Sequence, residues 1–143
     1  MFACFSKSGK STVKQSDFSG FVSYDDYFKQ KVKGEYLPVV NRELFLSNLF
    51  YEDIRGGEQL TWFKITKNCG FVFMSSQIVR LYNDISLDRL SNKNRSFHKR
   101  VYKVFKKDLS VNFLDYIRIY PIGLMVTIIK ICYYKINIVF SKI

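Results

Sequence analysis

Residues 95–107 read Arg95-Ser-Phe-His-Lys-Arg-Val-Tyr-Lys-Val-Phe-Lys-Lys107, and this stretch carries the clearest structural pattern in the chain. At about 100° per residue, its apolar side chains cluster within roughly 100° of arc on one side of a helix. Lysine and arginine side chains occupy the opposite side, and Ser96 is a favourable capping residue. The stretch therefore predicts an amphipathic helix whose outer face is purely cationic.

This cationic face lacks the mixture of charges that is usual on solvent-exposed helices, where opposite charges four residues apart stabilise the helix. Lys99, Lys103 and Lys107 follow one another at that spacing, and no acidic residue lies between positions 88 and 108. We predict that the face binds phosphate groups of lipid or RNA. The alternative is that it pairs with acidic residues from the first half of the chain. The predicted contacts are Arg95, Lys99, Arg100, Lys103, Lys106 and Lys107.

The net charge of +11 is unevenly distributed along the chain. Residues 1–60 hold eight basic and eight acidic residues, whereas residues 61–143 hold fifteen basic and four acidic residues. Such asymmetry favours an oriented molecule with one basic side that meets nucleic acid or an anionic membrane. Lys7, Lys10 and Lys14 near the N-terminus are predicted to add auxiliary contacts. General solubility is the plainer explanation of the charge.

The 143 residues correspond to one domain by size, and a 48% hydrophobic composition is sufficient for a core. Residues 1–34 are predicted to form a flexible polar and basic tail, because lysine alternates there with serine and threonine. Residues 35–143 are predicted to form a single compact α+β domain. It is expected to contain a mainly antiparallel sheet and two to three helices.

The first helix of this domain is predicted to begin after Asn41, which is a good capping residue, and to run from Arg42 to about Arg55. A strand over residues 44–51 is the competing prediction.

The next segment is predicted to form a hairpin and a helix. Residues 60–66 are rich in β-branched and aromatic residues, residues 68–70 form a turn, and residues 71–74 form the second strand. A serine pair then caps a helix over residues 76–83.

The C-terminal region is predicted to be β-rich. Residues 111–120 alternate as in a strand, Pro121 interrupts them, and residues 124–140 favour one or two further strands. A membrane-spanning helix over residues 119–140 is the alternative, since such a helix needs ~20 apolar residues. Lys130 would then lie near the bilayer centre at a cost of roughly 3 kcal/mol or more, so buried strands are preferred.

We predict no catalytic site, metal site or cofactor. The three cysteines, Cys4, Cys69 and Cys132, lack the spacing of a zinc site or of a disulfide framework. The absence of a disulfide framework is typical of proteins in a reducing compartment. His98 is the only histidine, has no neighbouring carboxylate to orient it, and is assigned to the basic face. Gly9-Lys10-Ser11 lacks the upstream glycine of a phosphate-binding loop. The chain is therefore expected to be a non-catalytic binding protein.

Four further residues complete the sequence-based expectations. Cys4 lies in a context that suits acylation, although a free thiol is the alternative. Trp62, Phe71 and Phe73 are interpreted as core residues rather than as a base-stacking platform.

No secretory signal is visible, so an intracellular location in the cytoplasm or at an inner membrane face is expected.

Three segments, Leu60–Thr66, Ser76–Tyr82 and Arg95–Phe105, are followed by the β-rich C-terminal region. This order of predicted elements, with the Lys/Ser tail, resembles the globular core of rhabdovirus-type matrix proteins. The resemblance implies a viral structural protein of the virion that self-associates and bridges a ribonucleoprotein and an anionic membrane. The chain is shorter than most such proteins and lacks their Pro-rich budding motif. A small RNA-binding accessory protein, such as a silencing suppressor or movement factor, is the alternative.

Overall fold

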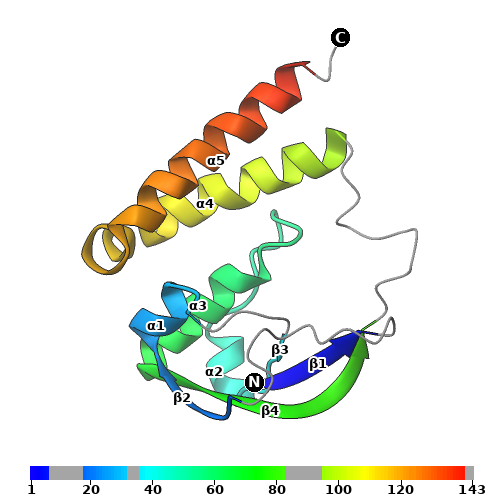
Figure 1. Ribbon diagram of the computed structural model, residues 1–143, viewed down its shortest axis with the longest axis vertical. Coiled ribbons are helices and arrows are strands. Elements are labelled where there is room, and N and C mark those ends of the chain that lie inside the picture. Colours follow the sequence, from blue (N-terminus) through cyan, green and yellow to red (C-terminus); the bar gives the residue numbers. More distant parts are fainter. Residues whose placement is uncertain (7–17, 32–35, 83–94, 141–143) are drawn as a thin grey trace. The chain divides into compact units, whose positions relative to one another are not determined.

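A computed structural model describes residues 1–6, 18–31, 36–82 and 95–140 (Figure 1). The chain forms two compact units. The sheet unit comprises Met1–Leu49 and Trp62–Arg89, and the hairpin unit comprises Phe50–Thr61 and Leu90–Ile143. The predicted α+β class is confirmed, whereas the predicted boundary at residue 35 does not coincide with either unit.

The sheet has four strands: β1 (Phe2–Ser6), β2 (Gly20–Ser23), β3 (Tyr36–Leu37) and β4 (Phe71–Tyr82). Their order is β2-β4-β1-β3, and β1 is hydrogen-bonded to a strand on each side. The β1–β4 pair is parallel and the other two pairs are antiparallel, so the sheet is mainly antiparallel as predicted.

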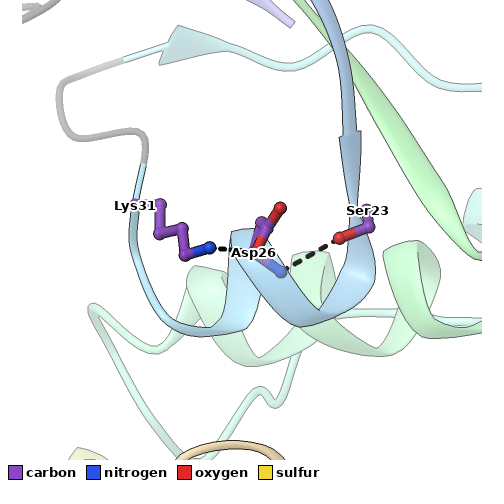
Figure 2. Close-up of polar contacts among 3 residues, drawn as sticks. All are labelled: Ser23, Asp26 and Lys31. Carbon is purple, nitrogen blue, oxygen red and sulfur yellow. Dashed lines mark hydrogen bonds and ion pairs between the residues drawn. The ribbon is translucent and has the colours of Figure 1, made fainter.

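The N-terminal segment corrects the expectation of a flexible tail up to residue 34, because its described part contains β1, β2 and helix α1 (Tyr24–Phe28). The Ser23 hydroxyl accepts a hydrogen bond from the Asp26 N–H at 3.2 Å, and Lys31 forms an ion pair with Asp26 at 2.7 Å (Figure 2). The hydrogen bond from Lys31 holds the Asp26 pKa below its ordinary value. The predicted contacts Lys7, Lys10 and Lys14 lie outside the described residues.

Helix α2 (Arg42–Leu46) confirms the predicted cap but is shorter than expected. The Asn41 side chain accepts hydrogen bonds from the N–H groups of Glu43 and Leu44 at 2.8 and 3.3 Å. The helix ends at Leu46, and Ser47 forms its C-cap, so neither a helix to residue 55 nor the competing strand is formed.

Helix α3 (Glu58–Cys69) replaces the strand that was predicted over residues 60–66. Glu58 in its first turn and Lys67 in its last turn complement the helix dipole. Within the sheet unit, Phe63 is buried against two aromatic rings of α1, with ring centroids 5.5 Å from Tyr27 and 5.0 Å from Phe28. This packing outweighs the β propensity of the segment.

Strand β4 confirms the predicted strand over residues 71–74 and then continues to Tyr82, where a helix was expected. Its second half pairs with β1, from Ala3 opposite Ile78 to Ser6 opposite Tyr82. A partner strand that lies more than seventy residues away explains why local capping signals were misleading here.

The hairpin unit contains α4 (Arg95–Ile119) and α5 (Pro121–Phe140), which lie side by side (Figure 1). Both segments beyond residue 110 that were predicted as strands are therefore helical. Five helices are present in the described residues, where two to three were expected. Tyr120 joins the two helices, and Pro121 begins α5 at a position where its missing N–H costs nothing. Gly123 is buried beneath the Tyr120 ring, where a larger residue would clash.

Candidate functional site

The cationic face predicted for residues 95–107 forms the outer side of the first half of α4. Lys99, Lys103 and Lys106 are exposed, whereas Arg100 and Lys107 are half-buried. Among the described residues, no ion pair involves the three exposed lysines. Arg95 begins the helix, and its side chain lies outside the described part of the structure.

Two open pockets border this face within the hairpin unit. The first, about 290 Å³, is lined by Arg55, Ser96, Lys99, Arg100 and Lys103 together with Asp53 and Ile54. The second, about 330 Å³, is lined by Asp53, Ile54, Lys103, Lys106, Lys107 and Ser110. Basic residues outnumber acidic ones in both pockets, and Asp53 lines both, so one acidic residue from the first half of the chain does lie near the lysines.

Lys107 differs from the exposed lysines because it is engaged by an aromatic ring. Its Nζ lies 4.8 Å from the centroid of the Tyr51 ring, which is a cation–π geometry. Part of its charge is therefore used within the hairpin unit.

The opposite side of α4 is apolar, as the helical period predicted, and it packs against α5. Phe105 stacks on Tyr134 with ring centroids 5.9 Å apart, and Phe97 meets the same ring edge-on at 6.2 Å. The Nζ of Lys130 lies 5.0 Å from the Phe105 ring centroid. These contacts define a seam between α4 and α5.

His98 belongs to this seam, which corrects its assignment to the basic face. Its ring is 5.7 Å from the rings of both Phe97 and Tyr134. The side chain is half-buried, and its Nδ1 has no hydrogen-bond partner among the described residues.

A chain of buried hydrogen bonds continues the seam toward the turn. Asp108 accepts hydrogen bonds from Asn112 Nδ2 at 2.8 Å and from the Tyr116 hydroxyl at 2.6 Å. The Thr127 hydroxyl of α5 donates to the Tyr116 oxygen at 3.2 Å. Burial raises the pKa of the Asp108 carboxyl, although both hydrogen bonds oppose this shift. Asn112 itself departs from helical geometry (φ −110°, ψ 16°) and kinks α4.

The outer side of α5 is apolar along its whole length, a feature that the sequence interpretation missed. Ile122, Ile129 and Ile136 are 68%, 64% and 54% exposed. At about 100° per residue, they belong to a set of residues that falls within roughly 140° of arc, opposite the seam. We call this set the apolar stripe. It consists of Ile122, Met125, Val126, Ile129, Tyr133, Ile136, Val139 and Phe140.

Helix α5 is long and apolar enough, by length and composition, to cross a membrane. Only 11% of its most apolar stretch is buried. The prediction of buried strands for residues 124–140 was therefore wrong in both secondary structure and burial. Beyond the kink, α4 also exposes apolar side chains at Phe113, Leu114 and Ile117, next to the exposed Arg118.

In the sheet unit, Phe71 and Phe73 were expected in the core but are exposed. The ring centroid of each lies 5.2 Å from that of Phe21, which is more exposed still. Trp62 is half-buried and stacks on Phe45 with ring centroids 6.1 Å apart. It is therefore less exposed than Phe71 and Phe73, although it was predicted to be a core residue.

Cys69 and Cys132 are exposed free thiols. Cys4 lies in β1 with its side chain outside the described part, so its acylation stays a prediction. Within the described residues, no group of three or more potential metal ligands is found.

Comparisons with known proteins give no relative. No protein-family model matches the chain, and no curated protein or solved structure is significantly similar to it.

The hydrogen-bonded seam gives a prediction about stability. Replacing Tyr116 with Phe removes the donor to Asp108 and the acceptor of Thr127, so two buried polar groups lose their shared partner. Tyr116→Phe should lower the free energy of unfolding by about 2 kcal/mol. Urea unfolding followed by the helical circular dichroism signal measures this. Tyr133→Phe is the control, because that exposed hydroxyl should contribute less than about 0.5 kcal/mol. Equal effects of both variants would show that the buried hydroxyl does not hold the seam.

Proposed function

We propose that this chain is a membrane-binding protein and that the hairpin unit makes the contact through the apolar stripe of α5. The exposure of this stripe carries the proposal. A core helix in a water-soluble protein has a similar composition, but it is mostly buried, whereas α5 is not. Exposed apolar patches of this kind mark interaction sites for proteins or membranes.

The energy available from the stripe is sufficient for binding. Complete burial of one large aliphatic side chain is worth roughly 1.5–3 kcal/mol, and the eight stripe residues are about half exposed. Their transfer to hydrocarbon would therefore contribute on the order of 10 kcal/mol before the cost of association.

Electrostatics favours an anionic membrane over a neutral one. Lys130 and Lys135 lie about 110° to either side of the stripe centre at a helical period, and both are exposed. A lysine close to an anionic membrane surface is worth about 1 kcal/mol. No acidic residue follows Asp115 in the sequence, so α5 carries no opposite charge of its own. Lys130 also lies over the Phe105 ring of α4, and its charge acts to lower the pKa of Asp108 against the larger effect of burial, so Lys135 is the lysine with less involvement inside the unit.

This proposal keeps the anionic membrane from the sequence-based prediction and moves the contact from α4 to α5. Two of the predicted elements that carried the resemblance to matrix proteins differ in the structure, because residues 60–66 form a helix and residues 76–82 form a strand, and the resemblance itself stays a prediction. A membrane-binding role requires no catalytic step.

The cationic face of α4 favours a second function, the binding of RNA or a ribonucleoprotein. Lys99, Lys103 and Lys106 lie opposite the seam on α4, whereas the stripe lies opposite the seam on α5. A flat membrane that contacts the stripe would leave these lysines on its aqueous side. Four basic side chains line one of the pockets beside them and three line the other, with Asp53 as the single acidic residue of each, so both linings carry a net positive charge that favours phosphate.

The stripe itself is tested by three isoleucines. The variant Ile122→Ser, Ile129→Ser and Ile136→Ser should bind both neutral and anionic vesicles at least about 100-fold more weakly, because three apolar anchors are lost. Vesicle flotation measures the bound fraction. The control carries Phe21→Ser, Val39→Ser and Leu46→Ser, which remove equally exposed apolar residues from the sheet unit. Equal losses in both variants would mean that binding depends on general stickiness.

The edge lysines are tested by neutralisation. Lys130→Gln with Lys135→Gln should weaken binding to anionic vesicles about 30-fold at low salt, through loss of about 2 kcal/mol, and leave neutral vesicles unaffected. Because Lys130→Gln also removes the contact with the Phe105 ring, Lys135→Gln alone is measured beside it and should give about a fivefold loss. Lys99→Gln with Lys103→Gln changes the net charge equally on the same unit and should have little effect. If the α4 pair matters as much, the membrane contact involves α4 and the assignment to α5 is wrong.

The second function predicts a change in salt dependence. Neutralising Lys99, Lys103 and Lys106 to Gln should reduce the log–log salt slope of single-stranded RNA binding by about 2 units, as expected for roughly three lost phosphate contacts. Filter binding over a salt series measures the slope. Neutralising Lys29, Lys64 and Lys67 in the sheet unit is the matched control. An unchanged slope in the α4 variant would remove RNA as the partner of this face.

A further inference from the structure

The angular arrangement of side chains on α5 specifies how the helix meets a bilayer. Every residue of the stripe is uncharged from Ile122 to Phe140, and lysines occur only at its two edges. In a helix that lies in the membrane interface, an apolar face enters the acyl region and lysines at its borders reach the phosphates. The side of α5 opposite the stripe is packed on α4, so the polar side that such an arrangement needs is supplied by the cationic outer face of α4. Length and composition alone do not separate this arrangement from a membrane span.

We infer that α5 lies parallel to the membrane in one leaflet, with the stripe facing the acyl chains and Lys130 and Lys135 at the level of the lipid phosphates. This inference rests on the proposed membrane-binding function and adds the orientation and the kind of surface that is recognised, a single anionic leaflet.

A membrane-spanning orientation of α5 is disfavoured because charged side chains of α5 and α4 would enter the hydrocarbon. Lys130 is the tenth of its twenty residues, so it would lie near the bilayer centre. Helix α4 packs along α5 and would enter the hydrocarbon together with the exposed Lys99, Lys103 and Lys106. An interfacial orientation leaves α4 on the aqueous side, with its cationic face in water.

Insertion of the turn end first is the other arrangement to consider, since Phe113, Leu114 and Ile117 are exposed beyond the kink. Arg118 follows directly, is exposed, and has no ion pair among the described residues. Turn-first insertion would carry this guanidinium, and the buried Asp115 one turn before it, into the hydrocarbon, where charged groups are costly. The stripe also continues to Phe140, far beyond the part that such insertion would cover.

Site-directed spin labelling of the full chain distinguishes these orientations. Cys4, Cys69 and Cys132 are replaced by Ser, and single cysteines are placed at Ile122, Ile129 and Ile136, all on one stripe. A label at Ser110, which is exposed on the outer side of α4, provides the aqueous reference. Collision with oxygen and with a water-soluble nickel chelate reports the depth of each label on phosphatidylcholine vesicles with about one third phosphatidylserine.

The inference predicts the same depth for all three stripe labels, about 5–10 Å below the phosphates, with Ser110 in water. A greatest depth at Ile129 would overturn it in favour of a span, and a steady decrease from Ile122 to Ile136 would overturn it in favour of turn-first insertion. Vesicle-bound protein with all three labels in water would overturn the inference and the assignment of the stripe, while leaving membrane binding intact. Failure of the labelled proteins and of the unlabelled chain to bind vesicles would instead refute the proposed function itself.

Discussion

The seam between α4 and α5 is the interaction on which the surface chemistry of the hairpin unit depends. At one end Tyr134 packs against Phe97 and Phe105, and at the other Thr127 joins the hydrogen bonds of Tyr116. These contacts fix the rotation of each helix about its own axis. Because the inner sides of both helices pack against each other, the lysines of α4 and the stripe of α5 point outward on opposite sides of the unit.

The buried carboxyl of Asp108 makes the seam specific as well as apolar. A carboxylate taken out of water is costly unless hydrogen bonds replace those of the solvent. Asn112 and Tyr116 each donate one, and Asn112 does so at the residue where α4 leaves helical geometry. A shift of either helix along the seam would separate Tyr116 from Thr127 and leave buried polar groups without partners. The network therefore penalises other registers of the two helices.

Local signals in the sequence predicted the parts of the fold whose partners lie nearby. The Asn41 cap and the two-sided pattern of α4 depend on residues within a few positions, and both were found. The second half of β4 was missed because its partner β1 lies at the other end of the sheet unit's sequence. Helix α3 was missed because residues 60–66 are rich in β-branched and aromatic residues, which favour strands when considered locally.

The sequence predicted the two-sided pattern of α4 but missed the apolar stripe of α5, and the binding role of the α4 lysines stays a prediction. The lysines of α4 stand out because their charge is unbalanced within one helical period, whereas α5 was read as strands from its many β-branched residues. Tertiary packing overrides such propensities, and α4 supplies that packing for α5. A helical projection of residues 121–140 would have placed Lys130 and Lys135 at the two borders of one apolar sector.

An exposed apolar stripe is expected to bind either a second copy of the chain or a lipid bilayer. The lysines at its edges favour one of these two partners. A second copy of the chain, packed stripe against stripe, would bring the edge lysines of both copies toward a shared border. Residues 116–143 contain no acidic side chain that could balance them there. Like charges at such a border oppose association. The phosphates of an anionic leaflet lie at the depth that these lysines reach and supply the missing opposite charge, so the bilayer is the better match to the same surface.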